Sequence, residues 1–199
     1  MDIRKFDRTA VLETVRILQR ATPDDWESPT PCAGWTLRRL VGHMAGQHHG
    51  FAASAGGSDD LAAWHPLDLG DDPLPVYRAA ALAAIDAFAP PEVLTRMFSL
   101  PEISTADRFP ASVAIGFHFL DYVVHGWDVA RTLGLPFEPS EEIADAALVI
   151  ALRVPDDERR LGSDPLFRPS LATAPGAGSL DLALTALGRN PGWSAPAHS

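Results

Sequence analysis

The chain has 199 residues, a formal net charge of −10 and 46% hydrophobic residues, a composition typical of a single globular domain. Its 16 basic residues are scattered along the chain, which argues against a nucleic-acid partner, because such proteins cluster Lys and Arg against phosphates. No apolar run approaches the roughly 18 residues of a membrane-spanning helix, so we expect no membrane partner. No secretory signal is visible, and the lone Cys32 cannot form an internal disulfide. We therefore expect a cytoplasmic protein.

Two helices are predicted in the first part of the chain. Apolar side chains recur at i, i+4 and i+7 over residues 7–21, which indicates one buried helical face before a proline-bearing turn. A loop rich in helix breakers follows over residues 27–34. Thr36 then offers an N-cap for a second helix over residues 37–55, which ends near two glycines.

The middle of the chain is less regular. Residues 56–75 contain several Gly, Asp and Pro residues and indicate a long surface connection. An Ala-rich helix is expected over residues 76–88 and ends at a pair of prolines. Residues 92–109 fit either a short strand or an irregular stretch.

The longest and most apolar helix is predicted over residues 110–133, where Gly134 ends it. A fifth helix follows over residues 140–154, and its acidic first turn suits the helix dipole. The remainder is rich in loops apart from one short helix over residues 180–187.

No internal repeat and no convincing ladder of strands is visible. The predicted fold class is therefore all-α, a helical bundle. Its domain covers residues 1–155, and residues 156–199 form a small, loop-rich C-terminal extension.

The apolar fourth helix carries the strongest chemical signal. Asp121 and His125 are four residues apart, so their side chains share one face and can converge on one metal ion. An ionised aspartate on such a helix is costly unless it is paired or coordinated. His118 lies on nearly the same stripe but about 10 Å away along the axis, so it packs or lies in an outer shell. The alternative interpretation is that His125 is a core histidine hydrogen-bonded to Asp121.

A third metal ligand is expected from a facing helix, because metal sites in bundles are built between helices. In the second predicted helix Leu40, His43 and Gln47 form one stripe, which makes His43 an inward-facing candidate. Three protein ligands leave positions open for water or substrate, the arrangement of a catalytic metal site.

Other reactive side chains near these elements have less support. Cys32 precedes a helix N-terminus, where a thiolate is favoured, but the sequence places no histidine beside it, and we expect a structural role. Asp128 is expected to orient a neighbouring group or to bind Arg131. Trp127 is expected in the core or in a pocket wall.

Two stretches and the end of the chain resemble one family. Residues 29–43, PTPCAGWTLRRLVGH, and residues 121–131, DYVVHGWDVAR, are similar to the DinB-like superfamily in its mycothiol-dependent maleylpyruvate isomerase branch. Residues 187–193, LGRNPGW, resemble the ending of short actinobacterial members of that branch.

The resemblance implies an up-down-down-up four-helix bundle and a divalent metal, zinc first and nickel second, bound by His43, Asp121 and His125. Many members carry glutamate or histidine where this chain has Asp121, which remains a competent ligand. The branch also implies mycothiol as a thiol cosubstrate. The function it implies is an enzyme, a transferase or isomerase, that activates the thiol for transfer to, or isomerisation of, a small electrophile.

One departure and two alternatives limit this expectation. The named isomerase carries a longer C-terminal domain, so maleylpyruvate isomerisation itself is not predicted here. The alternatives are a metal-independent enzyme of secondary metabolism on the same bundle and a non-catalytic metal- or ligand-binding protein. A homodimer stays open.

Four arginines in the last part of the chain are expected on the solvated surface rather than against an anionic substrate: Arg153, Arg159, Arg160 and Arg168.

Overall fold

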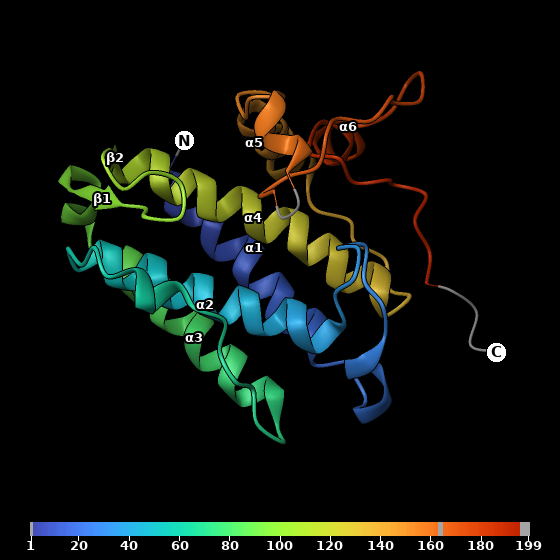
Figure 1. The fold of residues 1–199 in the computed structure, drawn as a ribbon, viewed down its shortest axis with the longest axis horizontal. Coiled ribbons are helices and arrows are strands. Elements are labelled where there is room, and N and C mark those ends of the chain that lie inside the picture. The colour runs from blue at the N-terminus through green and yellow to red at the C-terminus, as the bar shows by residue number, and fades with distance from the viewer. Residues whose placement is uncertain (1, 163–164, 196–199) are drawn as a thin grey trace.

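The computed structural model describes residues 2–162 and 165–195, and four long helices form its core (Figure 1). None of the helices among these residues is long and apolar enough to cross a membrane. The four helices are α1 (Ile3–Leu18), α2 (Leu37–Ala55), α3 (Pro73–Phe88) and α4 (Ala111–Thr132).

Contacts between the helices set their directions as up-down-down-up, as predicted. Asp7, early in α1, is hydrogen-bonded to His118, early in α4, so these two helices run parallel. Arg4 at the start of α1 donates to the carbonyl of Ala89 after the end of α3, so α1 and α3 are antiparallel. The rings of His43 near the start of α2 and His125 near the end of α4 lie 5.6 Å apart, so these helices are also antiparallel.

The connection from α2 to α3 returns along α2, which is why these two consecutive helices point the same way. The backbone N–H of Leu67 donates to the carbonyl of Gly42 inside α2 at 3.0 Å. This close approach depends on a stripe of glycines, because a Cβ at Gly46 or Gly50 would lie within 2.4 Å of the returning segment. The predicted surface connection is therefore partly buried, and Trp64 within it is only 3% exposed.

Residues 92–109 contain a small hairpin, so of the two alternatives left open for this stretch the short strand is confirmed. Strands β1 (Met97–Ser99) and β2 (Arg108–Pro110) pair antiparallel, with Phe98 opposite Phe109. Strands of three residues are too short for an alternating pattern to identify them, and the buried Phe98 holds β1 against the bundle. Short 3-10 turns lie at Pro23–Glu27, Leu61–Trp64, Pro91–Thr95 and Glu158–Leu161.

Helix boundaries follow local capping chemistry. Helix α2 begins after Thr36, as predicted, and the Thr36 side chain accepts a hydrogen bond from the backbone N–H of Arg39. Helix α1 begins earlier than predicted because Asp2 caps it. Helix α3 begins at Pro73, since proline is tolerated in a first turn.

The C-terminal part of the chain forms a second, smaller layer on the bundle (Figure 1). Helices α5 (Glu141–Ala151) and α6 (Ser179–Ala186) pack against each other there. The expectation of a solvated arginine is wrong for Arg160, which is 4% exposed, whereas the other three arginines are exposed. The Arg160 guanidinium is buried because it donates to the carbonyls of Val154, Pro155, Arg168 and Ala186.

Candidate metal centre

The imidazole of His125 lies between two carboxylates of its own helix. Its Nδ1 is hydrogen-bonded to Oδ2 of Asp128 at 2.9 Å, and its Nε2 lies 3.4 Å from Oδ1 of Asp121. These residues are four before and three after His125, so helical periodicity brings all three to one face. Both ring nitrogens of this buried histidine are therefore engaged by anions.

The electrostatics favour positive charge at this ring. Burial alone would lower the pKa of His125, but the charge of Asp121 and the hydrogen bond to Asp128 raise it well above its usual value. Burial would raise the pKa of Asp128, but the charge of Arg189 and the bond to His125 lower it to about 2. Asp128 is thus ionised at neutral pH, and a metal ion at Nε2 of His125 would take the place of the proton that these carboxylates favour.

His43 brings a second imidazole from the facing helix α2. Its ring lies edge-on to that of His125, with centroids 5.6 Å apart, and also contacts Trp35 at 5.1 Å. One ligand atom from each of His43, Asp121 and His125 lies within 4.8 Å of the others. The structure therefore brings together the three residues that the sequence nominated.

The donor set fits a divalent metal ion. Oδ2 of Asp121 is buried and has no hydrogen-bond partner among the described residues. A buried carboxylate oxygen without a partner is costly, and a cation bound there would remove that cost. Two imidazoles and one carboxylate are the ligands of many catalytic zinc sites, which keep a further position open.

A second cluster competes for a metal ion but already contains a cation. Ligand atoms of Cys32, His125 and Asp128 also lie within 4.8 Å of one another. The guanidinium of Arg189 reaches this cluster, with Nη2 at 3.1 Å from both Cys32 Sγ and Asp128 Oδ2. Because that positive charge would repel a metal ion, the ligand set with His43 is the better candidate.

Two expectations for neighbouring residues are resolved by these contacts. Asp128 orients His125, as expected, but its arginine partner is Arg189 and not Arg131, which lies over the ring of Trp127 instead. Cys32 lies beside Asp128 despite its distance in sequence, which local pattern did not indicate. Cys32 also contacts His125, because its hydrogen bond and charge are among the causes that raise the pKa of that ring, so the structure places a histidine beside Cys32 that the sequence did not indicate.

Arg189 is the residue of the site that sequence reasoning missed. It lies 61 positions after Asp128, beyond the reach of any helical spacing. The only signal was its place in the family-like ending LGRNPGW, where a charged residue directly follows a helix-ending glycine.

His118 belongs to a different buried network. Its Nδ1 is paired with Asp7, and its Nε2 lies 3.1 Å from Nδ1 of His48. This chain of contacts joins α1, α4 and α2 in the core. The expectation that His118 does not share the ion with His125 agrees with this placement.

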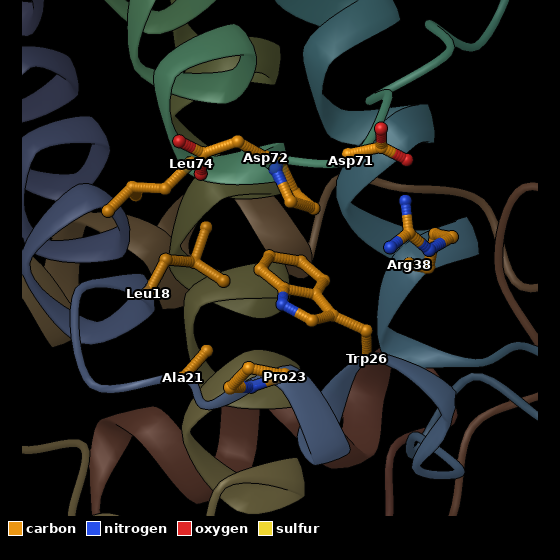
Figure 2. A pocket seen from close by; sticks show the side chains of 9 residues that line it. Leu18, Ala21, Pro23, Trp26, Arg38, Asp71, Asp72 and Leu74 are labelled. Atoms are coloured by element: carbon orange, nitrogen blue, oxygen red, sulfur yellow. The ribbon is translucent and has the colours of Figure 1, made fainter.

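A surface pocket of about 320 Å³ lies at another place, between the end of α1 and the starts of α2 and α3 (Figure 2). The indole of Trp26 lies across it, with Leu18 on one side and Arg38 on the other, and Asp71 and Asp72 lie at its rim. None of the three candidate ligands lines this pocket, so its size does not identify it as the chemical site.

Comparisons with known proteins identify a family and a shared fold. The family model of the mycothiol maleylpyruvate isomerase N-terminal domain matches residues 8–130, a range that includes all three candidate ligands. Two uncharacterized proteins, from two strains of Mycobacterium tuberculosis, are each 28% identical over 140 residues, covering 68% of this chain and 69% of the relative.

Two crystal structures share the fold. They are mycothiol-dependent maleylpyruvate isomerase and a histidine-to-alanine mutant of it, with TM-scores of 0.59 and 0.61 and sequence identities of 12% and 10%. Each superposition covers 80% of this chain and 70% of the other. The likeness confirms the predicted helical, DinB-like fold.

Proposed function

The chain belongs to the family of the mycothiol maleylpyruvate isomerase N-terminal domain, and from this membership we propose that it is an enzyme that uses a divalent metal ion and mycothiol to act on a small electrophile. The names of its structural neighbours support an isomerase over other thiol-dependent enzymes. The observation that carries the metal proposal is the unpartnered, buried Oδ2 of Asp121 beside two imidazoles.

His43, Asp121 and His125 would hold the ion, with zinc the first candidate and nickel the second. When bound there, the ion supplies a Lewis acid that lowers the pKa of a coordinated thiol or water. The proposed domain division is a bundle over residues 1–155, which carries the three ligands, and an extension over residues 156–199.

Side chains of the protein would orient the ligands and shape access to the site. Asp128 holds Nδ1 of His125, so Nε2 faces Asp121 and the ligand set. The side chain of Asp121 is 23% exposed while that of His125 is 9% exposed, so the thiol and the electrophile reach the site from the Asp121 side. The more deeply buried imidazole of His125 would form the inner wall of the site.

The proposed chemistry is addition of the thiol to an electrophilic carbon. Addition followed by elimination returns the thiol and isomerises the substrate, whereas retention of the new C–S bond is thiol transfer. Neither outcome requires an oxidant or a reductant. The substrate is a small molecule with an activated double bond or a comparable acceptor.

The test is elemental analysis of the purified protein followed by calorimetry with mycothiol. We expect about one zinc per chain, lost in His43→Ala, Asp121→Ala and His125→Ala but retained in Asp121→Glu, which keeps the carboxylate. The matched control is His49→Ala, which removes an exposed histidine of α2, the helix that carries His43, and should retain the metal.

Two results would contradict the proposal. A wild-type protein that refuses added zinc would remove the metal centre. A zinc-loaded protein that binds no mycothiol and converts no electrophile in its presence would remove the enzyme and leave a metal-binding protein.

A further inference from the structure

Arg189 contacts two residues beside the candidate metal centre, Asp128 and Cys32. Its Nε donates to Oδ1 of Asp128 at 3.0 Å, and its Nη2 donates to Oδ2 at 3.1 Å. The arginine is 8% exposed and the aspartate is 0% exposed, so solvent does not screen this pair. A two-pronged contact of this kind fixes both the position and the plane of the carboxylate.

The carboxylate in turn fixes the imidazole. Oδ2 of Asp128 accepts from Nδ1 of His125 at 2.9 Å, which leaves Nε2 facing Asp121 at 3.4 Å. An orienting partner on the second nitrogen commonly sets the tautomer and direction of a metal-binding histidine. The contacts therefore form a continuous path from the guanidinium to the nitrogen that would bind the metal.

The backbone after α6 is shaped to deliver this arginine. Gly188 adopts a φ of +77°, the left-handed conformation that ends a helix, and a Cβ there would lie 2.6 Å from Arg168. The N–H of Arg189 then donates to the carbonyl of Leu184 at 2.8 Å, which turns the chain back toward α4. The extension is thereby anchored on the bundle at the candidate metal centre.

We propose that Arg189 is a positioning residue of the metal centre: through Asp128 it holds His125 in the orientation that binds the ion. This inference rests on the proposed metal-dependent function. It gives the C-terminal extension a chemical role, because one of its side chains completes a site whose ligands all lie in the bundle.

The test compares zinc affinity in Arg189→Gln, Arg189→Lys and the wild type, by competition with a chromophoric chelator. We expect Arg189→Gln to bind zinc about 10- to 100-fold more weakly, and added guanidinium ion to restore part of the affinity. Arg189→Lys keeps the positive charge but loses the two-pronged contact, so its zinc affinity should lie between those of the wild type and Arg189→Gln. With cobalt in place of zinc, the visible absorption spectrum of Arg189→Gln changes, because a rotated imidazole alters the ligand field.

Arg160→Gln is the matched control, since Arg160 is another buried arginine of the extension but bonds backbone carbonyls and contacts Asp156 rather than Asp128. Circular dichroism and thermal melts of the metal-free variants check that each one folds. Zinc affinity unchanged in Arg189→Gln, or lowered equally in Arg160→Gln, would overturn the positioning role alone. Failure of the wild type to bind zinc would overturn the metal centre and this inference with it.

Discussion

Two side-chain polar atoms in the described part of the chain are buried without a hydrogen-bond partner, and their surroundings distinguish them. Oδ2 of Asp121 lies in a set of potential metal ligands, where a bound cation would satisfy it. Nε2 of His48 lies in the core, where the ring stacks on Tyr122 with centroids 4.0 Å apart. Burial and the nearby His118 hold the pKa of His48 well below its usual value, so this ring is neutral.

The neutral His48 predicts a loss of stability in mild acid. An unfolded chain takes up a proton on this histidine below about pH 6.5, whereas the folded chain does not. Stability therefore falls as the pH drops from about 6.5 to 5, by up to about 1.4 kcal/mol per pH unit from this group. The measurement is the free energy of unfolding in urea at a series of pH values.

A substitution isolates that contribution. His48→Gln removes the titrating ring, so its stability should depend less on pH over the same interval. The exposed His65→Gln, whose side chain is not among the causes of the His48 shift, should keep the wild-type slope. Equal slopes for wild type and His48→Gln would show that the ring does not resist protonation in the fold.

At the scale of elements, α2 packs closely against the segment that returns along it. A Cβ added at Gly46 would lie 2.4 Å from the carbonyl oxygen of His65, which is backbone and cannot rotate away. Elsewhere on a helix, alanine is favoured over glycine by about 1 kcal/mol. Here the steric conflict outweighs that preference.

We therefore expect Gly46→Ala to destabilise the protein by about 1–3 kcal/mol in thermal or urea unfolding. Gly116→Ala in α4 is the control, because its Cβ would meet only the end of the Ile150 side chain at 3.4 Å. That variant should be neutral or slightly more stable. If the two alanine variants were equally stable, the returning segment would not be held against α2.

Some of the elements could be predicted from the sequence and others could not. The limits of α2 and the length of α4 follow from local signals, an N-cap threonine for α2 and a largely apolar stretch ended by Gly134 for α4. For β1 and β2 the sequence left a short strand and an irregular stretch open, because strands this short depend on their packing against the bundle.

At the scale of the whole molecule, the proposed metal site links separate layers. The ligands come from α2 and α4, and Arg189 comes from the extension beyond α6. An ion that binds only this folded arrangement stabilises all of it, because unfolding would disperse the ligands.

Zinc should therefore raise the unfolding temperature of the protein. At a free zinc concentration of about 100 times the dissociation constant, the expected gain is about 2.7 kcal/mol. His43→Ala should abolish the shift in differential scanning calorimetry while the metal-free variant still folds, because His43 is only half-buried. A shift of the same size in His43→Ala would place zinc at a different site.

The sequence by itself determined the half of the candidate site that lies on one helix. Asp121, His125 and Asp128 share a face because helical spacing is a local property, and an ionised aspartate on an apolar helix marks that face as exceptional. The motifs around His43 and His125 also carried the family resemblance, and the match over residues 8–130 confirms it.

Only the tertiary structure decided the other half. It brought His43 to the ring of His125, gave Asp128 an arginine 61 positions away in place of the nearby Arg131, and put Cys32 against the same carboxylate. Such pairings depend on how helices cross and where the chain returns, and residue spacing does not encode either. Burial then gave each contact its strength, because a charge pair that is shielded from water interacts far more strongly than one on the surface.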